Sequence, residues 1–343
     1  MILVTGGAGY IGCVLAEELL AKGESVRVFD KMFFGDEGLA AVRDRIDLVE
    51  GDVRAIDEEV FAGVDAVIHL AGLSNDPTAE YNPRANYEMN TIATERIAKM
   101  CKKLGVRRFT FASSCSLYDK GLFAEDVILD ETVECVPRAA YAVSNYDAEK
   151  ILLEMADENF CPVILRQGTV YGYSPRMRYD LVVNTFLKDA FTKGFLTVFG
   201  GGEMWRPLVD VLDVAKAHIC AVEASDDKVH GEIFNVSNKN YRILELAHWV
   251  REALSETRDV DIKVDYSPMK GRSYRVSTKK IESQLGFRAG ISVKDSVTNM
   301  VKRVEADSKT DFLNPIYYNI QWMTMLDQME KTIQRVGSVF GSA

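Results

Sequence analysis

Short apolar runs alternate with amphipathic stretches along the first 165 residues of the chain. The apolar runs are rich in Val, Ile and Phe, as expected of buried strands. They lie at residues 1–5, 25–30, 46–52, 65–72, 107–114 and 161–167. Between them, residues 12–23 and 89–105 gather apolar side chains on one helical face, and each stretch ends at a glycine. Strands that alternate with helices in this order predict a parallel, doubly wound α/β sheet.

The pattern loosens after residue 166. Strand signals at 196–200, 232–237 and 261–266, separated by helical stretches, predict a smaller mixed α/β domain packed on the first. We expect three parts: residues 1–165 with part of 205–225 returning to them, residues 166–310, and a C-terminal helical extension at 311–343.

The extension carries its own helical pattern, because Trp322, Leu326, Met329, Ile333 and Val336 recur three or four residues apart. We expect this helix to cap its own domain, and a contact between subunits is the alternative.

Charge and cysteine content narrow the class of protein. The chain has 343 residues and a net charge of −10, so no basic excess exists to pair with nucleic-acid phosphates. Its six cysteines include no CxxC pair, which predicts reduced thiols and no metal site. The N-terminus lacks the features of a signal peptide, and no run of 18 apolar residues predicts a membrane span. We therefore expect a cytoplasmic protein.

A glycine-rich loop follows the first strand. The segment "VTGGAGYIG" carries Gly6, Gly9 and Gly12 in the spacing GxxGxxG between a strand and a helix. Glycine lets the backbone approach a pyrophosphate, and the helix N-terminus adds free N–H groups and a positive dipole end. The second strand ends at Asp30, which would accept hydrogen bonds from an adenosine ribose and repel a 2′-phosphate. The loop predicts a dinucleotide site that favours NAD, while the neighbouring Lys31 leaves NADP as the alternative.

Ordered motifs accompany this loop, namely "GDV" at 51–53, "HLAG" at 69–72, Asn90, "SSCSLY" at 113–118 and "YAVSN" at 141–145. Together they resemble the extended short-chain dehydrogenase/reductase family, and within it the nucleotide-sugar epimerase, dehydratase and 4-oxidoreductase branch. The resemblance covers about residues 1–305 and implies a Rossmann fold with NAD across the C-terminal edge of the sheet. The cofactor contacts that it implies are Gly6, Gly9, Tyr10, Ile11, Gly12, Asp30, Asp52, Val53, Leu70, Ala71, Gly72 and Asn90.

The second half resembles the same branch, through "WRPLVDVLDVAKA" at 205–217 and "GRSYRVSTKKIESQLGF" at 271–287. This resemblance implies a nucleotide-diphosphate sugar as substrate. An acidic chain needs local arginines to hold a diphosphate, and a guanidinium does so through paired hydrogen bonds. The substrate contacts that the resemblance implies are Ser116, Thr169, Asn184, Arg206, Arg272 and Arg275.

The catalytic motif departs from the family at one position. The resemblance implies that Tyr141 is the base for a sugar hydroxyl and that Ser114 hydrogen-bonds the reacting oxygen. A tyrosine with its usual pKa is ionised in only about one molecule in a thousand at neutral pH. In the family a lysine four residues later lowers that pKa, and here the position is Asn145. We expect Asn145 to anchor the cofactor ribose without supplying charge, which leaves Tyr141 a weaker base.

A second tyrosine has the missing spacing, because Lys150 follows Tyr146 by four residues. The helical face of Tyr146 is rotated about 140° from that of Tyr141, so only one of the two can face a nicotinamide. Pro137 and the register of the next strand favour Tyr141, and Tyr146 stays the alternative. Lys150 lies nine residues from Tyr141 and out of phase with it, so we expect a surface lysine.

These residues favour an NAD-dependent nucleotide-sugar epimerase or 4-oxidoreductase that acts through a 4-keto intermediate, as a homodimer. One alternative is a catalytically weakened member that binds NAD or a sugar nucleotide, and another is an NADP-dependent keto-sugar reductase. A 4,6-dehydratase is disfavoured, because Cys115 and Ser116 occupy the positions of the carboxylate pair that dehydratases of this branch use.

Overall fold

The computed structural model describes residues 1–118, 127–268, 271–306 and 310–337. Within them, the main element is a seven-stranded sheet in which every neighbouring pair is parallel, in the order β11-β7-β5-β4-β1-β2-β3. Its strands are β1 (Ile2–Thr5), β2 (Val26–Asp30), β3 (Asp47–Glu50), β4 (Ala66–His69), β5 (Arg108–Ser114), β7 (Cys161–Gln167) and β11 (Glu232–Val236). The predicted doubly wound α/β fold is confirmed.

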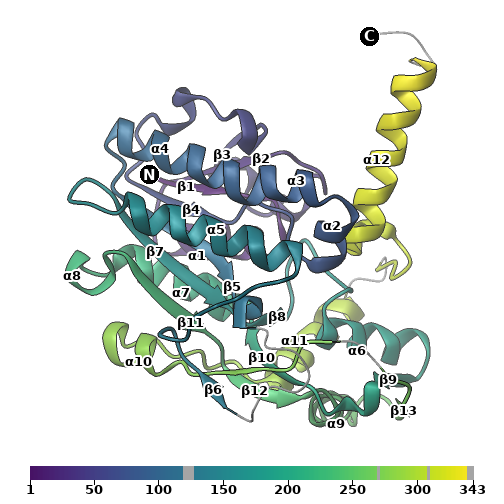
Figure 1. The fold of residues 1–343 in the computed structure, drawn as a ribbon. Coiled ribbons are helices and arrows are strands. Elements are labelled where there is room, and N and C mark those ends of the chain that lie inside the picture. The colour runs from purple at the N-terminus through teal and green to yellow at the C-terminus, as the bar shows by residue number, and fades with distance from the viewer. Residues whose placement is uncertain (119–126, 269–270, 307–309, 338–343) are drawn as a thin grey trace.

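Helices cover both faces of this sheet (Figure 1). One face packs on α4 and α5 and the other on α1 and α7, because alternate strand residues point to opposite sides. In β1, Leu3 belongs to the cluster under α4 and α5, whereas Ile2 and Val4 belong to the cluster around α1. The helices of this part are α1 (Tyr10–Ala21), α2 (Asp76–Tyr81), α3 (Pro83–Tyr87), α4 (Ala93–Leu104), α5 (Ala140–Met155), α7 (Val211–Glu223) and α8 (Asp226–Val229).

A smaller mixed α/β part lies beyond the carboxyl edge of the large sheet (Figure 1). It contains a three-stranded sheet and two pairs of strands, with the orders β12-β10-β8, β13-β9 and β14-β6. The strands are β6 (Ile128–Leu129), β8 (Thr169–Tyr171), β9 (Phe195–Phe199), β10 (Trp205–Asp210), β12 (Lys239–Arg242), β13 (Asp261–Asp265) and β14 (Arg275–Val276). The helices are α6 (Val182–Thr192), α9 (Ile243–Leu254), α10 (Lys279–Leu285) and α11 (Val293–Ala306).

The chain returns to the large sheet further along than the sequence predicts. Besides α7, which falls within the expected 205–225, the strand β11 pairs in parallel with β7 and forms an edge of the sheet. The remaining bounds of the three parts stay a prediction.

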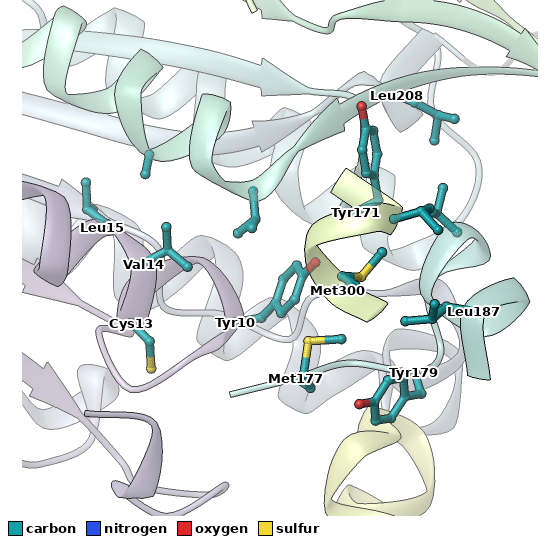
Figure 2. Packing of buried hydrophobic residues seen from close by; sticks show 14 of the residues in the cluster. Tyr10, Cys13, Val14, Leu15, Tyr171, Met177, Tyr179, Leu187, Leu208 and Met300 are labelled. Atoms are coloured by element: carbon teal, nitrogen blue, oxygen red, sulfur yellow. The ribbon is translucent and has the colours of Figure 1, made fainter. Parts of the chain in front are cut away.

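The two parts share one hydrophobic core around α1. Tyr10 and Cys13 of α1 lie in the same buried cluster as Met177, Tyr179 and Met300 (Figure 2). The Tyr10 hydroxyl donates a 2.6 Å hydrogen bond to the carbonyl of Gly172. This packing fixes the loop after β8 against the start of α1.

The C-terminal helix α12 (Asn319–Val336) projects from the body of the molecule (Figure 1). Its first turns contact the protein, since Asn319 is 7% exposed and the Trp322 indole donates a hydrogen bond to the carbonyl of Phe33. Its last turns do not, because Met329, Ile333 and Val336 are each about half exposed. The predicted helix is therefore confirmed, but only its beginning caps the domain. None of the described helices is long and apolar enough to cross a membrane.

Candidate active site

A cavity of about 360 Å³ lies at the carboxyl edge of the large sheet, where the two parts of the chain meet. This is the edge at which open α/β sheets bind ligands. Most of the residues predicted from the sequence line it. They are Gly6, Gly9, Tyr10, Ile11, Gly12, Asp30, Asp52, Val53, Leu70, Ala71, Gly72, Ser114, Ser116, Tyr141, Thr169 and Arg272.

The glycine loop closes one wall of the cavity with backbone alone. Gly6 has a φ of +73°, and a Cβ on it would lie 2.7 Å from the backbone nitrogen of Ala71. A Cβ on Gly12 would lie 2.3 Å from the carbonyl oxygen of Gly6. Helix α1 begins directly after Gly9, and no side chain caps its N-terminus. The free N–H groups and the dipole of α1 therefore form a ready anion site.

Two carboxylates stand at the far end of this wall. Asp30 accepts hydrogen bonds from the backbone N–H groups of Ala8 (3.0 Å) and Met32 (2.8 Å), and burial raises its pKa. Asp52 is held by Arg54, whose hydrogen bonds lower the pKa of Asp52 to about 2. The Lys31 ammonium lies 3.7 Å from Asp52. Because Asp52 already pairs with Lys31, the local charge at Asp30 stays negative, which suits ribose hydroxyls better than a phosphate.

Asn90 lies behind the cavity wall and not in it. Its amide accepts from the N–H of Leu73 (2.8 Å) and donates to the carbonyl of the same residue (3.0 Å). A Cβ on Gly72 would lie 2.8 Å from the Asn90 Oδ1, so the loop needs glycine there. Asn90 therefore shapes the loop that faces the cofactor, and a direct cofactor contact stays a prediction.

Tyr141 and Ser114 both line the cavity. Ser114 is the last residue of β5, and Tyr141 is the second residue of α5, so the end of a strand and the start of a helix bring them together. The Ser114 side chain acts on the Tyr141 phenol and lowers its pKa. Burial raises the pKa of Tyr141 above its usual value, and the charge of Asp76 adds to this. The charges of Arg178 and Arg272, like Ser114, act in the opposite direction.

Asn145 does not line the cavity with Tyr141. Its side chain is 4% exposed, and its Nδ2 donates a 2.8 Å hydrogen bond to the backbone carbonyl of Tyr141. The amide thus bonds to the backbone of its own helix, and the predicted contact with a ribose stays a prediction.

The second tyrosine lies elsewhere. Tyr146 packs against a cluster that includes Cys135 and Val276 and does not line the cavity. Lys150 is exposed, pairs with Asp147 at 2.7 Å and lies 4.9 Å from the centre of the Tyr146 ring. The expected surface position of Lys150 is confirmed.

The predicted substrate residues divide into two groups. Ser116, Thr169 and Arg272 line the cavity, whereas Asn184, Arg206 and Arg275 do not. Asn184 is fully buried, and its amide hydrogen-bonds the N–H of Gly172, the Tyr10 hydroxyl and the carbonyl of Arg178. It acts as a scaffold residue, because its polar atoms are already bonded within the protein.

Arg206 and Arg275 flank Trp205. The Arg206 Nη1 donates to the carbonyl of Trp205 at 2.9 Å, and the Arg275 guanidinium lies 5.0 Å from the centre of the Trp205 ring. Of the three predicted arginines, Arg272 is therefore the one placed to meet a diphosphate in the cavity.

Several residues that line the cavity are not among those predicted from the sequence. They are Asp76, Thr78, Arg176, Arg178, Tyr274, Asn319 and Met323. Asp76 forms an ion pair with Arg272 across the cavity, and Arg178 pairs with Asp180 through two hydrogen bonds of 2.9 and 3.0 Å. The signal in the sequence is the pair of arginines in "SPRMR", which follows the strand β8.

The cavity contains polar atoms that the described residues leave without a partner. They are the Thr78 Oγ1, the Ser116 Oγ, the Arg176 Nε and the Arg272 Nη1, each buried. Buried polar groups are rarely left unpaired in native proteins. Their concentration around one cavity indicates a polar, anionic ligand, and together with the glycine loop they fit a dinucleotide beside a second charged molecule.

Comparison with known proteins agrees with this site. Residues 2–237 match the profile of the NAD dependent epimerase/dehydratase family. The chain therefore belongs to that family, whose cofactor is NAD.

Individual relatives have several activities. The chain is 28% identical over 320 residues to a putative UDP-glucose 4-epimerase of Methanocaldococcus jannaschii, which covers 90% of this chain and 100% of the relative. It is 31% identical over 252 residues to a UDP-N-acetyl-alpha-D-glucosaminuronate decarboxylase of Bacillus cytotoxicus, which covers 71% of this chain and 76% of the relative. Among solved structures, UDP-glucose 4-epimerase of Thermotoga maritima with UDP-glucose superposes with a TM-score of 0.77 at 25% identity, over 89% of this chain and 98% of that one.

Proposed function

We propose that this protein is an NAD-dependent nucleotide-sugar epimerase or 4-oxidoreductase that acts through a 4-keto intermediate. The observation that carries the proposal is that Tyr141 and Ser114 line the same cavity as the glycine loop. When bound, NAD supplies a hydride acceptor. The glycine loop and Asp30 would hold this cofactor, and the proton chemistry falls to the side chains of the chain itself.

Tyr141 is the proposed base. Its phenolate oxygen takes the proton of the sugar 4-hydroxyl, and the Ser114 hydroxyl donates a hydrogen bond to the same oxygen and holds it in line. In an epimerase the keto sugar turns its other face towards the cofactor, and Tyr141 then returns the proton. In a 4-dehydrogenase the keto sugar leaves.

Arg272 is the proposed ligand of the substrate diphosphate, with Ser116 and Thr169 as further polar contacts. Its Nη1 is buried without a partner, although its other amino group pairs with Asp76. A guanidinium in this state can take a phosphate oxygen without giving up its carboxylate.

The position of Cys115 argues against dehydration. The thiol is fully buried and donates to the carbonyl of Arg166 at 3.1 Å, and burial raises its pKa. A thiol of this kind is a poor substitute for a carboxylate acid or base at neutral pH.

The test is turnover of a panel of UDP-, GDP-, CDP- and dTDP-sugars by the purified protein, with products identified by NMR and absorbance followed at 340 nm. Epimerisation gives an inverted sugar without net NADH, whereas a 4-dehydrogenase accumulates NADH. A reductase instead consumes NADPH with a 4-keto sugar. If neither the native protein nor Asn145→Lys converts any sugar in the panel, the catalytic proposal fails and the weakened binding protein is the better description.

A further inference from the structure

Arg176 is a buried cation in the wall of the cavity. It lies in the loop between β8 and α6, and only 6% of its surface is exposed. Its guanidinium lies 3.7 Å from the centre of the Phe34 ring, and its Nη2 donates a 2.7 Å hydrogen bond to Asn319 Oδ1. Its Nε is buried without a partner. The ring and the amide that this guanidinium contacts are both neutral.

The contrast with Arg178, two residues further along, is informative. Arg178 is equally buried, but Asp180 accepts two hydrogen bonds from it and neutralises its charge. Among the residues that the structure describes, no carboxylate forms an ion pair with Arg176. Asp30 forms no ion pair with Arg176 either, although its charge raises the pKa of that guanidinium. Burial, and then the charge of Arg178, lower the pKa of Arg176 to about 9. A buried charge without a counter-ion is unfavourable, so an anionic partner is missing.

The backbone places Arg176 at the start of α1. Its backbone N–H donates a 3.3 Å hydrogen bond to the Ser174 Oγ, and its charge acts on the thiol of Cys13, in the first turns of that helix. A Cβ on Gly38 would lie 2.7 Å from the Cys13 sulfur and 3.0 Å from the Arg176 Cβ, so the three residues are tightly packed. Met177, the next residue, lies close to Tyr10 in the shared core (Figure 2). Arg176 is therefore fixed beside the N-terminus of α1, where a dinucleotide diphosphate binds.

We propose that Arg176 binds the diphosphate of NAD, and that Asn319 of the C-terminal helix orients it for this contact. A diphosphate supplies the negative charge that the site lacks and an acceptor for the free Nε. Asn319 lies outside residues 2–237, which match the family profile, so the C-terminal extension contributes to the cofactor site. Two diphosphates are available in the proposed function, that of NAD and that of the sugar nucleotide. The proximity to α1 assigns Arg176 to the first. The inference rests on NAD binding alone and not on which sugar reacts.

The test measures by calorimetry the affinity of the full chain for NAD, ADP, AMP, adenosine and UDP, each added alone. The same measurements are made on Arg176→Gln. A hydrogen-bonded charge of this kind predicts that NAD and ADP bind about 10- to 100-fold more weakly to the variant. Adenosine and UDP should bind within about twofold of the native values. The matched control is Arg258→Gln. Arg258 also stacks on an aromatic ring (3.5 Å from Phe191) and has a buried Nε without a partner, but it does not line the cavity. Its replacement should leave NAD affinity unchanged.

Asn319→Asp keeps the shape of the wall and gives Arg176 a competing carboxylate, so it should also weaken NAD and ADP. If Arg176→Gln does not fold, the affinity of Asn319→Asp for NAD and ADP tests the proposal instead. Equal losses for adenosine and ADP would make Arg176 a structural residue only, and a loss confined to UDP would assign it to the substrate. The proposal would also be overturned if folded Arg176→Gln bound NAD and ADP with unchanged affinity. If only Asn319→Asp folds, the same result in that variant would overturn it. Because sugar turnover is not measured, the proposed function can fail without affecting this result.

Discussion

The side-chain amide of Asn145 donates a hydrogen bond to the backbone carbonyl of Tyr141, one helical turn earlier. A lysine at this position would extend beyond the helix and bring a positive charge near the phenol. The shorter amide instead turns back on its own helix. Tyr141 therefore lacks the electrostatic support that the family motif provides, and the remaining charges around it belong to Asp76, Arg178 and Arg272.

Asn145→Lys should increase activity at neutral pH. A tyrosine base works when it is deprotonated, so the raised pKa of Tyr141 predicts activity that climbs through the alkaline range. A charge about 5 Å away contributes about 3 kcal/mol at an effective dielectric near 20, or roughly 100-fold more phenolate. The pH–rate profile should therefore move to lower pH. Asn145→Gln, which adds length without charge, is the control and should leave the profile in place. An unchanged profile for Asn145→Lys would show that Tyr141 is not the titrating base.

The two tyrosines of α5 should respond differently to loss of their hydroxyls. Tyr141→Phe should lower kcat by about 10²- to 10⁴-fold, as expected for removal of a general base. Tyr146→Phe and Lys150→Ala should keep native kcat and KM, because neither side chain lines the cavity. Steady-state kinetics on the best sugar nucleotide distinguishes them. A large loss in Tyr146→Phe with a native-like Tyr141→Phe would reverse the assignment.

Asp76→Asn should make Tyr141 a better base. The Asp76 carboxylate raises the pKa of Tyr141, and it also neutralises Arg272, whose charge lowers that pKa. Removing the carboxylate lowers the pKa of Tyr141 through both effects. The alkaline limb of the pH–rate profile should therefore move to lower pH, by less than in Asn145→Lys. Glu80, on the same short helix, has no contact with the cavity, and Glu80→Gln is the matched control. A limb that moves to higher pH would contradict this account.

A buried ion pair behind the active site should dominate the effect of mutations in α5 on stability. Glu149 and Arg166 are 1% and 3% exposed, lie 2.6 Å apart and are further bonded to Ser113 and Tyr118. Glu149→Gln leaves a buried guanidinium without its counter-ion, which should reduce the free energy of unfolding by about 3–5 kcal/mol. Urea denaturation of this variant, beside the exposed neighbour Lys150→Ala, measures the difference. Nearly equal midpoints for the two variants would show that the pair contributes little.

The sequence predicted what depends on local order along the chain. The strands from 1–5 to 161–167 follow from runs of buried apolar residues, and the glycine loop follows from its place between a strand and a helix. Tyr141 and Ser114 are predicted from their places in the motifs, and both line the cavity. The resemblance implies three arginines, of which only Arg272 lines the cavity, since Arg206 of β10 and Arg275 of β14 lie against Trp205.

The sequence by itself determined the order of elements and the parallel sheet. It also determined which residues the glycine loop and the ends of the strands bring to the carboxyl edge of that sheet. Helices and strands depend on hydrogen bonding and burial within a few residues of the chain. The periodicity of apolar residues in the sequence therefore predicts them. Only the tertiary structure decided which distant side chains complete the cavity. Arg176 and Asn319 are 143 residues apart, and Asp76 and Arg272 are 196 apart. Such contacts depend on how α1, α2, α12 and the loop after β8 pack together, and no local pattern encodes that packing.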